Sequence, residues 1–279
     1  MMRLTLCIVL AMQLLCWTTE GVAATQSTSA SRNPDAKWQG GLKQFYFGDR
    51  PILDGADVIA LQAPQRAEDG AVVPLRITAG FAQTPQRSIK TLSLIIDNNP
   101  VPLAGTFHFT QASGKADLAL RVRVNEYSQV RVVAETNDGA LYMTQRFVKA
   151  SGGCSAPAGS DLDVAMQRLG KIRFKVGDQT AGELVPTQLA ISHPNLTGLQ
   201  KDQVTLLNIP AHFVNKVKVT YQGEQVFSAE TDISVSENPN FRFYFVPEEP
   251  GGELLAEIED SNQQKFTQVI RYAQPGAAQ

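Results

Sequence analysis

Short runs of apolar residues, separated by turn-forming residues, make up most of the chain. In residues 118–124 (LALRVRV) the side chains of Leu118, Leu120, Val122 and Val124 fall on one face of an extended strand. Similar runs, rich in Val, Ile, Thr, Phe and Tyr, predict strands at 57–61, 72–79, 88–96, 116–123, 128–135 and 141–149. The turn signal Asp138-Gly139 predicts a hairpin between 129–136 and 141–148.

A second series of strands follows a break in this pattern. It is predicted at 172–176, 183–192, 212–221, 225–235, 241–246, 254–260 and 265–271. Phe241, Phe243 and Phe245 alternate on one face of their strand, which favours a buried core position over an exposed aromatic binding platform. Because helical periodicity is almost absent, the pattern predicts an all-β protein with two antiparallel β-sandwiches.

The break itself has the composition of a linker. Residues 149–160 (KASGGCSAPAGS) are small and rich in Gly, Ser and Pro, so we expect an exposed, flexible connection. A short helix is predicted after it, with Ser160 as N-cap, Asp163 at the capping-box position and Gly170 near its end. The expected organisation is a flexible N-terminus at 25–37, a first sandwich at 38–150, a linker and helix at 151–170, a second sandwich at 171–273 and a tail at 274–279.

The N-terminus has the features of a secretory signal peptide at 1–24. Met1-Met2-Arg3 is positively charged, and the apolar run 4–17 is shorter than the roughly 20 residues of a membrane-spanning helix. Val22-Ala23-Ala24 supplies small residues for cleavage, whereas Leu14-Leu15 is a poor match to a lipoprotein signal at Cys16. We therefore expect a periplasmic or secreted protein without a membrane span in its mature form.

Composition and charge exclude several classes of function. The balance of 25 basic against 27 acidic residues provides no basic field for nucleic acid. Three cysteines and three histidines are too few for a zinc framework or a disulfide-dense scaffold. The chain shows no glycine-rich phosphate loop and no serine-nucleophile elbow, and we expect no catalytic residue, metal or cofactor.

Signal cleavage leaves a single cysteine. Cys7 and Cys16 depart with residues 1–24, so the mature chain keeps only Cys154, which cannot form an internal disulfide. Gly152 and Gly153 before it, with Ser155 after it, provide no bulky side chain to shield the sulfur. Two interpretations stay open: an accidental free thiol in a linker, or a reactive thiol that carries a cargo.

The three histidines are weaker candidates. His108, His193 and His212 do not have the spacing of a helical metal site, so structural or surface roles are expected for all three. A catalytic pair of Cys154 with His193 is the alternative.

Several motifs resemble the SoxYZ sulfur carriers of bacterial thiosulfate oxidation. The first half is similar to SoxY in 68–74 (EDGAVVP), 124–128 (VNEYS) and 148–154 (VKASGGC). The second half is similar to SoxZ in three places: His193-Pro194, residues 210–214 (PAHFV), and Glu237-Asn238-Pro239 with the following 241–243 (FRF). Taken whole, the chain resembles the fused, quinoprotein dehydrogenase-associated SoxYZ-like carriers, in which GGCSAPA joins the two halves.

This resemblance implies a fold, a site and partners. It implies two immunoglobulin-like sandwiches joined by a Gly-rich linker, with Cys154 as the covalent attachment point of a sulfur intermediate and Gly152, Gly153 and Ser155 as the carrier arm. The implied partners are periplasmic oxidoreductases: Sox-type enzymes, c-type cytochromes or a quinoprotein dehydrogenase. The arm of the family ends in a free Gly-Gly-Cys-Gly-Gly tail, whereas here Ser155 and Ala156 replace the trailing glycines and a whole domain follows.

Three functions are therefore weighed. The first is a non-catalytic carrier with cargo on Cys154. The second is an accessory binding protein for a quinoprotein alcohol dehydrogenase system, in which Cys154 is dispensable. The third is a thiol enzyme that uses His193 as its base.

Overall fold

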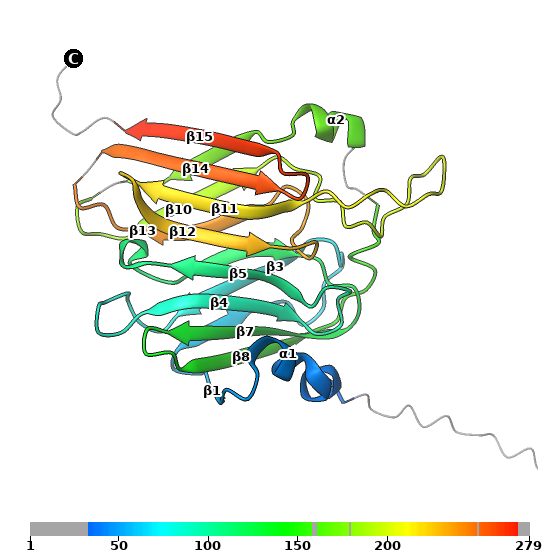
Figure 1. Cartoon of the computed structure of the whole chain (residues 1–279), viewed down its shortest axis with the longest axis horizontal. Coiled ribbons are helices and arrows are strands. Elements are labelled where there is room, and N and C mark those ends of the chain that lie inside the picture. The colour runs from blue at the N-terminus through cyan, green and yellow to red at the C-terminus, as the bar shows by residue number, and fades with distance from the viewer. Residues whose placement is uncertain (1–32, 158–160, 179, 250, 273–279) are drawn as a thin grey trace, which may run out of the picture. The chain divides into compact units, whose positions relative to one another are not determined.

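The computed structural model describes residues 33–157, 161–178, 180–249 and 251–272. Contacts divide the chain into Met1–Asn33 and Pro34–Gln279, and the fold described here is that of the second unit. Its strands form two sheets that pack face to face (Figure 1), so the predicted all-β fold class is confirmed. The predicted signal peptide, residues 25–32 of the predicted flexible N-terminus, and the tail at 274–279 lie outside the described residues.

The first half of this unit, residues 34–157, contains eight strands. They are β1 (Ile52–Asp54), β2 (Ile59–Gln62), β3 (Val73–Ala79), β4 (Ile89–Ile96), β5 (Leu103–Phe109), β6 (Leu118–Val122), β7 (Ser128–Thr136) and β8 (Leu141–Val148). The helical segments are η1 (Trp38–Leu42), α1 (Lys43–Phe47) and η2 (Gln111–Ser113). Each predicted strand overlaps an observed one, and β7 and β8 form the predicted hairpin.

The second half, residues 161–272, contains one short helix and seven strands. They are α2 (Leu162–Gln167), β9 (Ile172–Val176), β10 (Val185–Ile191), β11 (Val214–Tyr221), β12 (Glu224–Thr231), β13 (Asn240–Phe245), β14 (Gly252–Asp260) and β15 (Lys265–Tyr272). Asp161, rather than the predicted Ser160, caps α2: its carboxylate accepts the N–H groups of Asp163 and Val164 at 2.9 and 3.3 Å. Ser160 lies outside the described residues.

Both sheets run through both halves. The nine-stranded sheet has the order β1-β8-β7-β4-β5-β12-β11-β14-β15, and the six-stranded sheet has the order β2-β3-β6-β13-β10-β9. The halves meet where β5 pairs with β12 (Figure 1) and, in the other sheet, where β6 pairs with β13. The two halves are thus joined by strand pairing in both sheets, in addition to the chain that connects them.

The core between the sheets is shared in the same way. Phe107 of β5 stacks on Phe227 of β12, with ring centroids 6.4 Å apart, and Phe227 stacks on Phe243 of β13 at 4.7 Å. Phe241, Phe243 and Phe245 are all buried, which confirms the predicted core face of this strand. One hydrophobic cluster therefore contains residues of both halves.

Two strands and the N-terminal helical segment were not predicted. In β5 the small residues Ala104 and Gly105 weaken the apolar pattern, and a Cβ on Gly105 would lie 2.9 Å from the carbonyl oxygen of Glu230 across the junction. β1 has only three residues and pairs with β8 in parallel at the sheet edge. The segment η1–α1 packs Trp38 on the outer face of the nine-stranded sheet, against Ile95 and other apolar residues. Among the described residues, no helix is long and apolar enough to span a membrane.

Candidate functional site at the junction of the two halves

Cys154 lies in a segment, residues 150–156, that leaves β8 and enters the junction between the halves. The carbonyl of Gly152 accepts hydrogen bonds from the N–H groups of Ser155 (3.2 Å) and Ala156 (2.9 Å), so the chain turns here, and Gly152 has φ +72°. Ser155 is exposed, but Cys154 is a free thiol with no exposed surface. The prediction of an exposed thiol in a flexible linker is therefore wrong for this conformation, because both halves cover the segment.

The first half binds the segment through its backbone. Gly152 N–H donates to the carbonyl of Asn125 at 2.8 Å, and Cys154 N–H donates to the Asn125 side-chain oxygen at 3.3 Å. Gly153 N–H donates to the carbonyl of Val124 at 3.2 Å, and a Cβ at this position would lie 2.1 Å from the carbonyl oxygen of Gly70. Gly153 is thus required by a close approach of two backbones, rather than for flexibility.

The second half closes over the other side. The hydroxyl of Thr197 donates to the carbonyl of Cys154 at 2.6 Å, and the Gln200 amide donates to the carbonyl of Ala156 at 2.9 Å. Arg123, on the first half, donates from Nη1 to the carbonyl of Gly153 at 3.2 Å and from Nη2 to the carbonyl of Asn195 at 3.3 Å. A single buried guanidinium therefore ties the segment to both halves.

This environment keeps the thiol protonated. Burial raises the pKa of Cys154 to about 11, and the positive charge of Arg123 opposes that rise only in part. Burial also lowers the pKa of Arg123, whose Nε has no hydrogen-bond partner among the described residues. We call this conformation, in which both halves cover residues 150–156, the docked form. Because the thiolate is the nucleophile, the Cys154 thiol is unreactive in the docked form.

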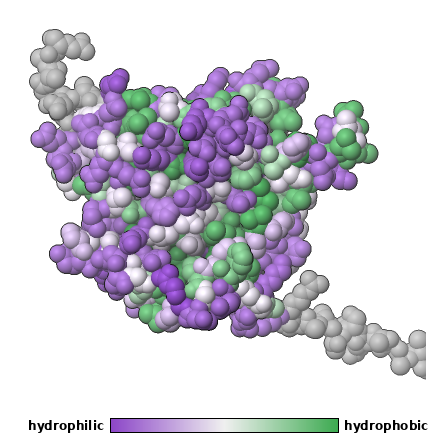
Figure 2. Space-filling view, in the orientation of Figure 1, coloured by the Kyte–Doolittle hydropathy of each residue, from purple (hydrophilic) through white to green (hydrophobic). Residues whose placement is uncertain are grey.

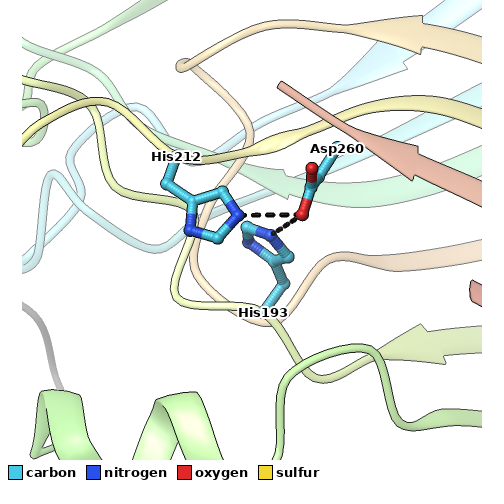
Figure 3. A group of neighbouring side chains, drawn as sticks. All are labelled: His193, His212 and Asp260. Atoms are coloured by element: carbon cyan, nitrogen blue, oxygen red, sulfur yellow. Dashed lines mark hydrogen bonds and ion pairs between the residues drawn. The ribbon is translucent and has the colours of Figure 1, made fainter. Parts of the chain in front are cut away.

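Two of the three histidines meet beside this junction, which their sequence positions did not reveal. His193 follows β10, His212 precedes β11, and Asp260 ends β14 (Figure 3). One Asp260 oxygen lies 2.8 Å from His212 Nε2 and 3.6 Å from His193 Nε2, and the imidazole rings meet edge to face at 4.7 Å. The third histidine, His108, is partly exposed 3.4 Å from Glu230.

The possible ligand atoms of His193, His212 and Asp260 lie within 4.8 Å of one another, so we asked whether these residues could bind a metal ion. His193 Nδ1 accepts the N–H of Asn195 at 3.0 Å, so a neutral His193 carries its proton on Nε2. A metal ion at Nε2 would have to replace that proton and leave an imidazolate. The arrangement fits a buried polar cluster better than a metal site: His212 and Asp260 share a hydrogen bond, while His193 Nε2 has no hydrogen-bond partner among the described residues.

The charges in this cluster follow from burial. Burial, and to a smaller extent the neighbouring His212, lower the pKa of His193, and although Asp260 acts in the opposite direction the net pKa is about 4. For Asp260, burial raises the pKa, but the hydrogen bond with His212 and backbone N–H groups outweigh it and the net pKa is lowered. The lone pair of neutral His193 is used by Asn195, so it is not free to accept a proton from Cys154.

Comparison with known proteins was made on the sequence and on the fold. Residues 43–154 match the family model of the sulfur oxidation protein SoxY, and residues 172–271 match that of the sulphur oxidation protein SoxZ. No curated protein matches the chain. The match to SoxY ends at Cys154.

Solved structures resemble parts of the chain. The sulfur carrier protein SoxY from Chlorobium limicola f thiosulfatophilum is 25% identical, covers 39% of this chain and 87% of its own, and has a TM-score of 0.32. A superoxide reductase (neelaredoxin) from Ignicoccus hospitalis is 14% identical over 34% of this chain and 80% of its own, with a TM-score of 0.31. A putative superoxide reductase from Thermotoga maritima is 15% identical over 37% and 95%, with a TM-score of 0.31. Since the two family matches together cover well over half of the chain, it belongs to the SoxYZ-like carriers, with a SoxY domain and a SoxZ domain fused in one polypeptide.

Proposed function

We propose that this protein is a non-catalytic carrier that holds a sulfur compound covalently on Cys154 and presents it to periplasmic oxidoreductases. The main support is the position of Cys154, at the last residue of the SoxY match and at the junction with the SoxZ domain. In this proposal Gly152, Gly153 and Ser155 form the carrier arm. Sox-type enzymes, c-type cytochromes or a quinoprotein dehydrogenase act as partners, and export follows cleavage after Ala24.

Loading of the carrier requires the arm to leave the position it has here. The thiolate attacks a sulfur atom of the cargo and a new S–S bond forms as the leaving group departs with its electron pair. A thiol with no exposed surface and a pKa of about 11 does not do this at neutral pH. The docked arm is thus a resting form, in which the empty thiol is protected from oxidation.

A second function is favoured by the same burial. Cysteines with a purely structural role are also buried and unreactive, as Cys154 is here. The alternative is an accessory binding protein for a quinoprotein alcohol dehydrogenase system, with the Cys154 segment serving only to hold the two domains together. These two functions differ in whether Cys154 ever carries a cargo.

The deciding experiment is the intact mass of the mature protein from its native periplasm, with and without reductant. A carrier shows a reductant-removable adduct on Cys154, whose mass identifies the cargo, and Cys154→Ser abolishes its function. Ser151→Ala is the matched control, because it changes an exposed side chain of the same segment outside the carrier arm and keeps the thiol. An unmodified thiol under all growth conditions, with an active Cys154→Ser variant, would establish the accessory function instead.

A further inference from the structure

A short hairpin, residues 200–209, projects from the body of the SoxZ domain (Figure 1). Lys201 and Asn208 form an antiparallel bridge at its base. One carboxylate oxygen of Asp202 accepts the N–H groups of Val204 (3.1 Å) and Thr205 (2.6 Å) and the Thr205 hydroxyl (2.8 Å). The tip therefore has a defined backbone that Asp202 holds in place.

The tip of this hairpin is apolar and exposed. Val204, Leu206 and Leu207 are 89%, 67% and 70% exposed, and the projecting end carries hydrophobic surface (Figure 2). Isolated apolar side chains are ordinary on protein surfaces, but here three of four consecutive residues form one exposed apolar tip on a projection.

The backbone at Leu206 strengthens this interpretation. Leu206 has φ +59°, in the left-handed region that glycine and asparagine adopt with least strain. Its side chain is largely exposed, so packing within the fold does not explain a leucine here. A strained, exposed and apolar residue indicates that the side chain serves a contact outside the molecule.

The base of the hairpin holds the Cys154 segment. Gln200 donates to the carbonyl of Ala156 at 2.9 Å and accepts the N–H of Thr197 at 3.1 Å. Thr197 in turn donates to the carbonyl of Cys154 at 2.6 Å. A protein that grips the tip is therefore brought to the end of the molecule where the thiol lies.

We propose that the tip formed by Val204, Leu206 and Leu207 is the docking element for the oxidoreductase that works on Cys154, and that it inserts into an apolar pocket of that enzyme. The proposal rests on the carrier function and names the surface that the partner uses. Three side chains offer far less than the roughly 1,200 Å² buried in a stable complex. The contact is therefore brief, as a carrier that moves between enzymes requires, and too small to hold two copies of this chain together.

The test is site-specific photo-cross-linking of the full chain in its native periplasm. A photoreactive benzoylphenylalanine is placed at Val204, or at exposed Ser155 next to the thiol, with Glu224 as the control position. Glu224 is the exposed first residue of β12, directly after the turn that ends β11, and it lies at the far end of β11 from the hairpin. We expect Val204 and Ser155 to capture the same oxidoreductase, and Glu224 not to capture it.

The second arm of the experiment uses the variant V204S/L206N/L207S. Asn tolerates the left-handed conformation of Leu206, so the melting temperature should stay equal to that of the wild type or rise. With the probe at Ser155, capture of the oxidoreductase should fall at least tenfold in this variant. Unchanged capture from Ser155 overturns the proposal, as does capture of lipid or of a second copy from Val204.

Failure of docking is distinguishable from failure of the carrier function. Docking does not need the thiol, so capture from Val204 should persist in Cys154→Ser. If Cys154 never carries an adduct but this capture persists, the carrier function fails and the docking surface stands. If the adduct is found but the tip variant changes no capture, the docking surface fails and the carrier stands.

Discussion

Replacing Gly153 by alanine tests whether the Cys154 segment is held as the structure shows. A Cβ at this position would lie 2.1 Å from the carbonyl oxygen of Gly70 and 2.7 Å from that of Val124. Both are backbone atoms of the SoxY domain, so the segment itself has to move away. We therefore expect Gly153→Ala to undock the Cys154 segment from the junction.

The size of the effect follows from the contacts that would be lost. Displacing Gly153 and Cys154 breaks at least three of the hydrogen bonds that hold the segment: those from Gly153 N–H to Val124, from Cys154 N–H to Asn125 and from the Thr197 hydroxyl to Cys154. At about 1 kcal/mol each, their loss weakens docking by about 3 kcal/mol. Since 1.4 kcal/mol is a factor of ten, the undocked population should rise by about a hundredfold.

Alkylation of Cys154 by iodoacetamide at pH 8, followed by intact mass, measures this population. With its pKa raised to about 11, the docked thiol is only about 0.1% thiolate at this pH, so the label enters through the undocked state. The rate should rise about a hundredfold in Gly153→Ala. Low urea should hardly change it, because local undocking exposes little surface compared with global unfolding.

Gly152→Ala is the matched control for this prediction. A Cβ at Gly152 meets no atom within 4 Å, but its φ of +72° costs an alanine about 1 kcal/mol. The expected increase in alkylation is therefore about fivefold. A rate in Gly153→Ala within twofold of the wild type, or one that rises steeply with urea, would refute the docked arrangement.

Three further predictions concern stability. Acidification from pH 6.5 to 4 should lower the free energy of unfolding by up to about 3 kcal/mol, because burial lowers the pKa of His193 from 6.5 to about 4 and only the unfolded chain gains the proton in this range. In His193→Gln, the free energy of unfolding from urea melts should depend less on pH across this range. An equally steep dependence on pH in that variant would contradict the assignment to His193. Asp97→Asn should cost about 3–5 kcal/mol in urea melts, because it leaves Arg131, with a side chain 1% exposed, without its buried partner. Asp35→Asn, which removes a 31% exposed carboxylate from the same guanidinium, should cost less than about 1 kcal/mol, and equal losses would count against this argument. Phe243→Ala in the SoxZ domain should lower the free energy of unfolding by about 3–5 kcal/mol. Because the halves share both sheets and the core, the unfolding transition followed by Trp38 fluorescence in the SoxY domain should shift together with the one followed by far-UV circular dichroism. Separate transitions would contradict this.

Much of the fold could be predicted because β-strands leave a local signature. The alternation of Phe241, Phe243 and Phe245 identified the core face of β13, and Asp138-Gly139 identified the hairpin of β7 and β8. The missed strand β5 shows where local patterns fail, because its pairing with β12 depends on a distant segment. Its Gly105 makes sense only beside the carbonyl of Glu230, 125 residues along the chain.

The candidate site shows the same division. Counting cysteines was enough to single out Cys154, and the resemblance to SoxY motifs was enough to identify the family. Neither could predict that the thiol is buried, because its cover comes from Asn125, Arg123 and Thr197, which approach it from two domains. The small residues that suggested flexibility instead allow the two backbones to touch.

The sequence by itself therefore determined most of the strands, their division into two series and the choice of Cys154 as the candidate residue, since periodicity, turn chemistry and residue counts are local properties. Only the tertiary structure decided that both sheets cross the junction, that His193 and His212 share Asp260, and that Cys154 is docked. The physical reason is that strand pairing, burial and pKa depend on residues far apart in the chain, whose approach no local pattern encodes.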